Sequence, residues 1–385
     1  MTLSQRPKAL DAASPSASKP LTFFYTHVSP KAVERVTAVL RSGWLNEGEV
    51  TREFECEMAR VLGLSHPVAV NSGTSALHLA LVLAGVGSGD EVILPAQTFV
   101  ATALVILMQG ATPVFADIDP YTGNIDPQSI TGKITPRTKA LMPVHWGGCP
   151  CDMEEINAIA TRHGLAVIED AAHALGATYQ GKPIGAVSRF AAFSFQAIKH
   201  LTTGDGGLLC CLSEEDAREA RRRRWFGIDR ASVQRSIIGD RGYDISVLGY
   251  KYHMNNVAAA LGLGNLEDFP SRLTRRQQIG AFYRKELASV PGLELLRVDP
   301  DRTHAYWVFT VLVERRQDFA RKLAEEGIPT TVVDLSIDRN SVFGGICDDL
   351  PGQAEFNERQ IAIPLHEGLS ENDLEKVVTT VCGGW

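Results

Sequence analysis

A lysine enclosed by apolar residues is the first feature of this sequence that could do chemistry. Lys199 stands among Phe195, Ile198 and Leu201, which is unusual for a side chain that normally lies in solvent. Partial desolvation lowers the pKa of a lysine amine and makes it the nucleophile that Schiff-base formation requires. The glycines of the following Gly204-Asp205-Gly206-Gly207 would let the chain turn closely past a ligand. Lys199 is therefore a candidate for a covalent bond to a carbonyl cofactor.

A carboxylate at the end of an apolar run is the second feature. Asp170 follows Ala166-Val167-Ile168, and a carboxylate at the end of a buried strand is unfavourable unless it meets a cation or several donors. A protonated pyridine nitrogen is one such cation. Ionised Asp170 would keep that nitrogen protonated, which makes the ring an electron sink. His173 could bond the ring hydroxyl or stack beside the ring. The alternative is that Asp170 only caps a helix.

Two further segments could bind the rest of a planar, phosphorylated cofactor. Gly73 permits a tight turn between a strand and a helix, and the free N–H groups of the helix start, with the hydroxyls of Thr74 and Ser75, would cradle a phosphate. Ser194 offers another hydroxyl, and Phe99 could cover one face of the ring. The alternatives are ordinary helix caps for Thr74 and Ser75 and a core position for Phe99.

These motifs must be positioned by a sheet, because each follows a predicted strand. Short apolar runs alternate with amphipathic stretches from residue 24 to 266, which predicts an α/β domain with a mainly parallel sheet sandwiched by helices. Ligands bind at the carboxyl edge of such sheets. The expected strands are 66–70, 91–94, 112–116, 138–144, 165–168, 189–194 and 207–211, and the helices between them include 75–84, 99–109 and 152–163.

The chain is expected to divide into three parts. Residues 1–23 are rich in Ser, Ala and Pro and predict a flexible N-terminal arm, 24–266 form the large domain, and 267–385 form a smaller C-terminal α+β domain. In this last part we expect a helix over 272–290, a strand over 305–313, and helices over 317–326 and 371–381.

Composition excludes several classes of function. The 385 residues are 44% hydrophobic and carry a net charge of -7, which disfavours binding to nucleic acid or anionic lipid. No run approaches the roughly 18 apolar residues of a membrane span. The seven scattered cysteines suit a reducing cytoplasm, and Cys149-Pro150-Cys151 is too closely spaced for zinc ligands, so we expect no metal site. A Gly-x-Gly-x-x-Gly run, which a nicotinamide enzyme would need, is lacking at the first strand–helix turn.

Taken in order, four motifs resemble those of the DegT/DnrJ/EryC1/StrS sugar aminotransferases. They are residues 72–77, 98–99, 169–173 and 193–207. The resemblance runs from about residue 42 to the C-terminus and implies fold type I of the pyridoxal 5'-phosphate (PLP) enzymes, the aspartate-aminotransferase fold. It also implies a homodimer with both active sites at the interface.

The same resemblance implies roles for individual residues. Lys199 would carry PLP as a Schiff base, Asp170 would partner the pyridine nitrogen, and His173 would lie beside the ring oxygen. The remaining cofactor contacts would be the phosphate-binding Thr74, Ser75 and Ser194 at the Gly73 turn, with Phe99 stacked on the ring.

The segment 248–256 resembles a stretch that reaches into the neighbouring subunit and often supplies an Asn to the phosphate. Here Lys251 and His253 occupy the corresponding positions, so we expect cofactor contacts from one or both.

A lysine at position 199 favours transamination, because the dehydratase branch of this family has histidine there. The expected reaction moves an amino group from L-glutamate to a keto-sugar, a nucleotide-linked 4-keto-6-deoxy sugar by the resemblance of residues 202–207. Trp44 and Trp146 offer flat faces for a sugar or base, or are structural aromatics. The alternatives are a PLP-dependent dehydratase, a cyclitol aminotransferase, or a non-catalytic PLP-binding regulator.

Overall fold

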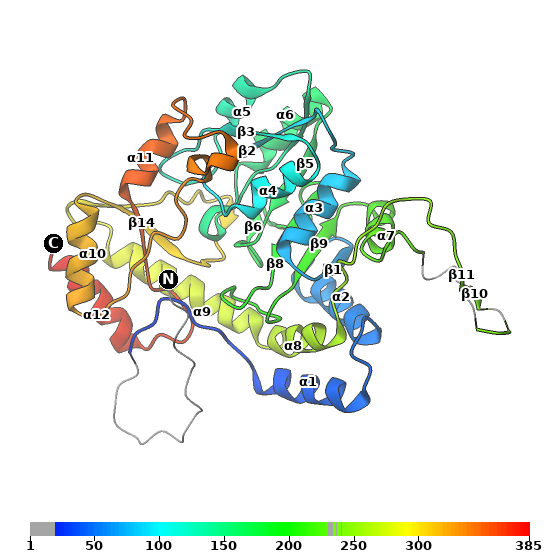
Figure 1. Ribbon diagram of the computed structural model, residues 1–385. Coiled ribbons are helices and arrows are strands. Elements are labelled where there is room, and N and C mark those ends of the chain that lie inside the picture. The colour runs from blue at the N-terminus through cyan, green and yellow to red at the C-terminus, as the bar shows by residue number, and fades with distance from the viewer. Residues whose placement is uncertain (1–19, 230–233, 236, 240) are drawn as a thin grey trace.

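The computed structural model describes residues 20–229, 234–235, 237–239 and 241–385 (Figure 1). Residues 1–19 of the predicted arm lie outside the described residues. The last residues of that arm are packed, since Phe23 lies against a cluster formed by Trp307 and Val308. In the described part of the chain, no helix is long and apolar enough to cross a bilayer. The same residues contain no cluster of three His, Cys, Asp or Glu that could hold a metal ion.

A seven-stranded sheet forms the centre of the molecule, and all seven predicted strands are present. The strand order is β1 (Pro67–Val70), β9 (Gly207–Cys211), β8 (Phe190–Ser194), β5 (Ala166–Asp170), β4 (Thr138–Leu141), β2 (Glu91–Pro95) and β3 (Thr112–Ala116). Strand β9 runs antiparallel to both of its neighbours, and the other strands are parallel. The predicted mainly parallel sheet is therefore confirmed.

Helices cover both faces of this sheet (Figure 1). They are α3 (Gly73–Leu83), α4 (Ala101–Met108), α5 (Pro127–Lys133), α6 (Met153–His163) and α7 (Glu214–Arg223). Because successive side chains of a strand point to opposite faces, one strand contributes to two cores. In β5, Val167 joins one hydrophobic cluster and Ile168 the other. This burial on both faces explains the continuous apolar runs of the strands.

Helices near the N-terminus pack against the last helix before the predicted domain boundary. They are α1 (Pro30–Ser42), α2 (Glu49–Leu62) and α8 (Asn256–Leu266), which lie together below the sheet in Figure 1. A two-stranded ribbon, β10 (Gln234–Arg235) and β11 (Arg241–Gly242), projects from the molecule on the side of α7, at the right in Figure 1.

The C-terminal part has its own antiparallel sheet and hydrophobic core. The sheet order is β12 (Leu293–Leu295), β14 (Phe309–Val313) and β15 (Gln360–Ile363), packed with α9 (Phe269–Glu286), α10 (Arg316–Glu325) and α12 (Glu371–Cys382). The remaining elements are the small sheet of β6 (Thr178–Tyr179), β7 (Lys182–Pro183) and β13 (Arg302–Thr303), and helix α11 (Pro351–Arg359). We propose the domain boundary at 266/267, between α8 and α9.

Three predicted elements differ from the observed ones by three or more residues at one or both ends. Strand β4 stops at Leu141 because Pro143 has no N–H to donate to a neighbour. Helix α9 begins at Phe269, where Pro270 occupies its first turn, and ends at Glu286 instead of 290. Strand β14 begins at Phe309 instead of 305, because the N–H of Trp307 bonds to the carbonyl of Gly147 and not to a neighbouring strand.

Candidate active site

The predicted site residues lie at the carboxyl edge of the sheet, where β1, β5 and β8 end. Ser194 is the last residue of β8 and Gly73 is the first residue of α3. A Cβ on Gly73 would lie 2.9 Å from the Cβ of Ser194, so only glycine lets the helix start approach this strand so closely. Two segments separated by more than a hundred residues are thus brought side by side.

The start of α3 forms a turn with free N–H groups. Ser72 caps the helix, and its Oγ accepts a hydrogen bond of 3.0 Å from the N–H of Ser75. The Ser75 hydroxyl donates to Asn71 Oδ1 at 2.6 Å, and the side chain is buried. Thr74 is exposed at the same turn. The N–H groups of the helix start and the hydroxyls of Thr74 and Ser194 therefore suit a phosphate, as P-loops and similar turns do.

Asp170 is the last residue of β5, and it is buried with two donors. Its Oδ2 accepts a hydrogen bond of 2.7 Å from Thr102 Oγ1, and its Oδ1 accepts one of 3.1 Å from the N–H of Ala172. Burial raises the pKa of Asp170, while the two donors and the Lys199 amine act to lower it. A bound cation would stabilise this carboxylate further.

Lys199 follows β8 in a loop, and its amine lies above an aromatic ring. Nζ is 3.7 Å from the ring centroid of Trp307. Burial lowers the pKa of Lys199 to about 8, against the opposing effect of the Asp170 and Asp334 carboxylates. A neutral amine near pH 8 is a competent nucleophile toward an aldehyde. The sequence predicted this lowered pKa from the apolar neighbours of the lysine.

His173 stacks on the same indole as Lys199. The His173 and Trp307 ring centroids are 3.8 Å apart with an interplanar angle of 16°. Burial keeps the pKa of His173 well below its usual value, and the Lys199 amine acts in the same direction. The imidazole is therefore neutral near pH 7 and can donate or accept a hydrogen bond at the ring of a ligand.

Phe99 is connected to Asp170 through a short polar chain. The Thr102 hydroxyl that bonds Asp170 also contacts the carbonyl of Phe99, at 3.1 Å. The Phe99 side chain is 59% exposed, so it is not a core residue. The exposed phenyl ring is available to a planar ligand.

The segment that carries Lys251 and His253 runs beside the end of β1. The N–H of Asn71 donates to the carbonyl of Tyr252 at 2.7 Å, and His253 forms a bridge with Val70. Lys251 is exposed, and His253 Nε2 lies 2.9 Å from Asn46 Oδ1. Both residues are thus near the α3 turn.

The two tryptophans considered for substrate contact differ in the exposure of their side chains. Trp44 is 68% exposed, whereas Trp146 is 1% exposed. The indole of Trp146 packs edge-on against Phe356 and His173. Trp146 is a core residue and offers no free face, so the alternative of a structural aromatic is confirmed for it and that of a substrate contact is wrong.

Three residues of the site were missed by sequence reasoning. Thr102 contacts Asp170, and Trp307 contacts Lys199. Asp334 comes from the loop after α10, where Gln97 Nε2 and Gln360 Nε2 donate to its carbonyl at 3.1 and 2.9 Å. Burial raises the pKa of Asp334 to about 6, with an opposing effect from Lys199. Trp307 and Asp334 lie in the C-terminal part, far from every motif in the sequence.

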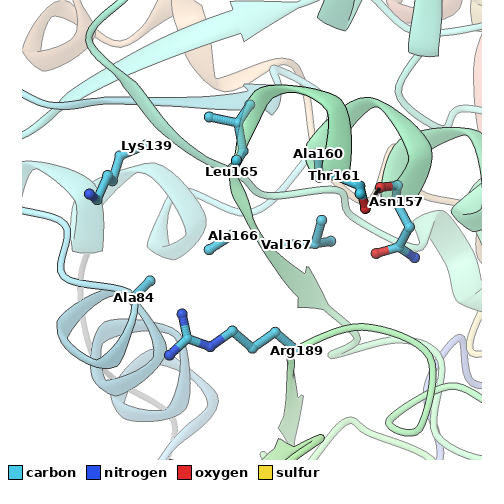
Figure 2. Close-up of a pocket in the computed structure, with 10 residues that line it drawn as sticks. Ala84, Lys139, Asn157, Ala160, Thr161, Leu165, Ala166, Val167 and Arg189 are labelled. Carbon is cyan, nitrogen blue, oxygen red and sulfur yellow. Dashed lines mark hydrogen bonds between the residues drawn. The ribbon is translucent and has the colours of Figure 1, made fainter.

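A cavity of about 300 Å³ opens at the opposite edge of the sheet. Its lining contains none of the candidate active-site residues. Lys139 and Arg189 flank the small side chain of Ala166 there (Figure 2). Arg189 is neutralised by two hydrogen bonds of 3.0 Å to Asp216. We therefore place the candidate active site at the carboxyl edge and not in this cavity.

Known proteins match almost the whole chain. The model of the DegT/DnrJ/EryC1/StrS aminotransferase family matches residues 27–382. The spore coat polysaccharide biosynthesis protein SpsC of Bacillus subtilis is 40% identical over 366 residues, covering 92% of this chain and 94% of the relative. GDP-perosamine synthase of Caulobacter vibrioides is 37% identical over 88% of this chain and 91% of its own.

Solved structures agree with the predicted fold. AtS13 from Actinomadura melliaura has a TM-score of 0.91 at 40% identity and covers 96% of this chain and 100% of its own. The protein Spr1654 of Streptococcus pneumoniae, solved in a PLP form, has a TM-score of 0.87 at 29% identity, over 94% of this chain and 98% of its own. These matches confirm the predictions of fold type I and of a PLP cofactor. The chain belongs to the DegT/DnrJ/EryC1/StrS aminotransferase family and is a PLP-dependent sugar aminotransferase.

Proposed function

We propose that this enzyme moves the amino group of L-glutamate to the ketone carbon of a nucleotide-linked 4-keto-6-deoxy sugar. The observation that carries this proposal is the presence, at one sheet edge, of the Lys199 amine, 3.7 Å from the ring centroid of Trp307, and the buried carboxylate of Asp170 at the end of β5. A phosphate-binding turn lies at the same edge. The residues present thus fit each polar group of PLP.

Each residue has a separate task in this proposal. PLP, when bound, supplies a protonated ring that accepts electrons from the carbon under reaction. Lys199 would hold the cofactor at its aldehyde carbon, and the amine, once released, would move the proton from the α carbon of the donor to that carbon. Asp170 keeps the proton on the ring nitrogen, and His173 stays neutral beside the ring. The turn at Gly73 holds the phosphate, with Thr74, Ser75 and Ser194 as its hydroxyl-bearing neighbours.

The choice of a nucleotide-linked sugar is supported by the relatives. One of them, at 37% identity, is named a GDP-perosamine synthase, and another takes part in spore coat polysaccharide biosynthesis. The exposed indole of Trp44 offers a flat apolar face of the kind that sugars and bases stack on. We propose amination at C4 and not at C3.

We also propose that the enzyme is a homodimer with shared active sites. Trp44 and Leu248 are 68% and 71% exposed, so this chain leaves two large apolar side chains uncovered, and a second subunit would cover them. Lys251 is exposed near the phosphate-binding turn, and Asn71 Nδ2 donates to its carbonyl at 3.4 Å. In the dimer, Lys251 and His253 would reach the phosphate of the partner's cofactor. Light scattering of the holoenzyme should give twice the chain mass.

The first test of the proposed function is the visible spectrum of the PLP-loaded enzyme. We expect excess L-glutamate to remove the band of lysine-bound PLP and to produce the pyridoxamine form and 2-oxoglutarate, without any sugar present. D-Glutamate is the matched control and should leave the band unchanged. A band that persists with L-glutamate, but disappears with another amino acid, would contradict the proposed donor.

The acceptor is tested with the pyridoxamine-loaded enzyme. We expect GDP- and dTDP-linked 4-keto-6-deoxy sugars to restore the lysine-bound band, and 3-keto isomers to restore it at least about tenfold more slowly. Restoration by a ketocyclitol alone would replace the proposed substrate class. Loss of the sugar hydroxyl without amine transfer would indicate a dehydratase.

Cofactor capture should depend on pH through the Lys199 amine. Only the neutral amine attacks an aldehyde, and burial lowers the pKa of Lys199 to about 8. We therefore expect the rate constant for PLP capture by the apoprotein to rise with pH and to level off above about 8. Stopped-flow absorbance between pH 6 and 10 measures it. A rate that still rises tenfold per pH unit above pH 9 would mean an ordinary, solvated lysine.

A further inference from the structure

The indole of Trp307 contacts two groups of the proposed mechanism, the Lys199 amine and the His173 imidazole. Lys199 Nζ lies 3.7 Å from its ring centroid, and the His173 ring is stacked on it at 3.8 Å. Trp307 itself is 4% exposed, so its ring is held by packing and does not swing freely. An aromatic face attracts an ammonium group placed above it.

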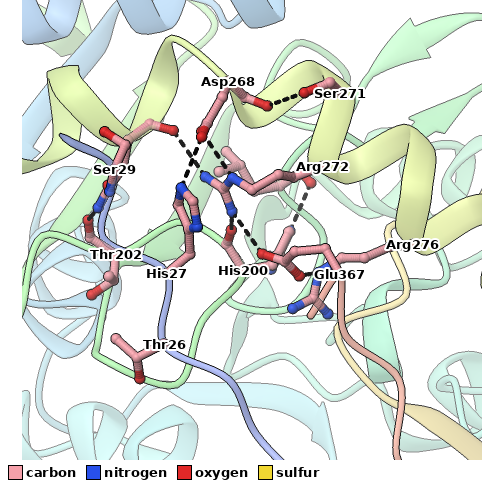
Figure 3. Close-up of polar contacts among 12 residues, drawn as sticks. Thr26, His27, Ser29, His200, Thr202, Asp268, Ser271, Arg272, Arg276 and Glu367 are labelled. Carbon is pink, nitrogen blue, oxygen red and sulfur yellow. Dashed lines mark hydrogen bonds and ion pairs between the residues drawn. The ribbon is translucent and has the colours of Figure 1, made fainter. Parts of the chain in front are cut away.

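The other end of the indole holds the backbone of the Lys199 loop. Trp307 Nε1 donates a hydrogen bond of 3.0 Å to the carbonyl of Ile198, the residue before Lys199. The backbone carbonyls of Ala197 and His200, on either side of Ile198 and Lys199, also accept hydrogen bonds. Thr26 donates to the carbonyl of Ala197 at 2.9 Å, and Arg272 donates to that of His200 at 2.7 Å; Figure 3 shows His200, Arg272 and Thr26 around the loop. Among these three donors, only Trp307 also contacts the amine.

A strained backbone places Trp307 at this position. Tyr306 has a φ of +48°, which a residue other than glycine rarely adopts. Its ring stacks on His304 at 3.9 Å and lies against Gly280, where any Cβ would collide with it. The next N–H, of Trp307, then bonds to the carbonyl of Gly147 at 2.9 Å. Such strain persists only where surrounding contacts enforce it, and it is found at functional sites.

We propose that Trp307 is a positioning residue for Lys199: its ring face holds the amine whenever Lys199 is not bonded to the cofactor, and its N–H fixes the loop beneath. This inference rests on the proposed function, in which the amine is released and reused in each half-reaction. The four-carbon side chain of lysine has many rotamers, and the contact with Trp307 selects those that keep the amine at the site. Trp307 thereby keeps the amine close to the carbon atoms between which it moves the proton.

The charge of the free amine depends on every group that faces it. Asp170 and Asp334 favour the ammonium form, and burial opposes it. His173 and His200 are neutral near pH 7, because burial lowers the pKa of each, that of His200 to about 3. The indole face adds a further stabilisation of the ammonium form. Removal of the ring should therefore shift the amine toward its neutral form.

The experiment measures the Lys199 amine in the apoprotein, with neither donor nor sugar. Acetic anhydride labels neutral amines, and mass spectrometry of the Lys199 peptide gives the labelling rate against pH. For Trp307→Leu we expect a lower midpoint and a roughly three- to tenfold faster rate at pH 7. Trp307→Phe keeps an aromatic face and should fall between this variant and the wild type.

Trp385→Phe is the matched control, because Trp385 Nε1 donates the same kind of bond, 2.7 Å long, to the carbonyl of Glu314 far from the site. It should label as the wild type does. If Trp307→Leu does not fold, fluorinated tryptophan at position 307 keeps the shape and weakens the attraction of the ring, with the same expected shift.

A wild-type midpoint in folded Trp307→Leu, or in the fluorinated protein, would overturn the inference. The labelling uses no substrate, so its outcome is separate from that of the glutamate and sugar assays.

Discussion

Lys199→Ala should lower the rate of amine transfer by about 10⁴-fold or more, while the protein stays folded. The change removes both the covalent anchor of PLP and the group proposed to move the proton, and each of these effects alone is worth orders of magnitude. The purified variant should also lack the visible band of lysine-bound PLP. The measurements are 2-oxoglutarate release with a keto-sugar acceptor and the absorption spectrum.

Stability separates this loss from unfolding. Truncation of Lys199 removes a buried amine from the face of Trp307, so the melting temperature should stay within a few degrees of the wild type. Lys139→Ala is the matched control, because Lys139 is an exposed lysine at the opposite edge of the sheet. It should retain full activity. Substantial turnover by folded Lys199→Ala would remove Lys199 from the mechanism.

The sheet and most of its site could be predicted from the sequence because the signals are local. Asp170 and Ser194 each end an apolar run, and parallel strands bring such ends to one edge. The enclosure of Lys199 by apolar residues likewise indicated its lowered pKa. The close approach of Gly73 to Ser194 could not be predicted, since it depends on how α3 packs against β8.

The residues that were missed have no local signal. Trp307 stands in an apolar stretch that is typical of a strand, and the positive φ of Tyr306 and the bond of the Trp307 N–H to Gly147 turn it out of the sheet. Asp334 lies in a loop whose position depends on Gln97 and Gln360, which are distant in sequence. Residue type also does not reveal burial, which is why Trp44 and Trp146 were treated alike although only Trp44 is exposed.

Asp170→Asn should slow the glutamate half-reaction by about 10²- to 10⁴-fold with little loss of stability. Asparagine has the same size, and its amide can still bond to Thr102 and to the N–H of Ala172, which hold the carboxylate at 2.7 and 3.1 Å. It cannot keep a proton on the ring nitrogen, so the ring loses most of its electron-accepting power. Single-turnover absorbance with saturating L-glutamate measures the rate, while the lysine-bound band reports that PLP is retained.

Thr102→Val distinguishes the charge of Asp170 from its placement. This variant keeps the carboxylate and removes one of its donors, a bond worth about 1.5–3 kcal/mol to a charged group, so the rate should fall roughly tenfold. Burial already raises the pKa of Asp170, and without the Thr102 hydroxyl that pKa rises further. The acid limb of the rate profile should then move to higher pH, because the ionised form is required. An acid limb unchanged in Thr102→Val, together with wild-type rates in Asp170→Asn, would assign the ring nitrogen to another partner.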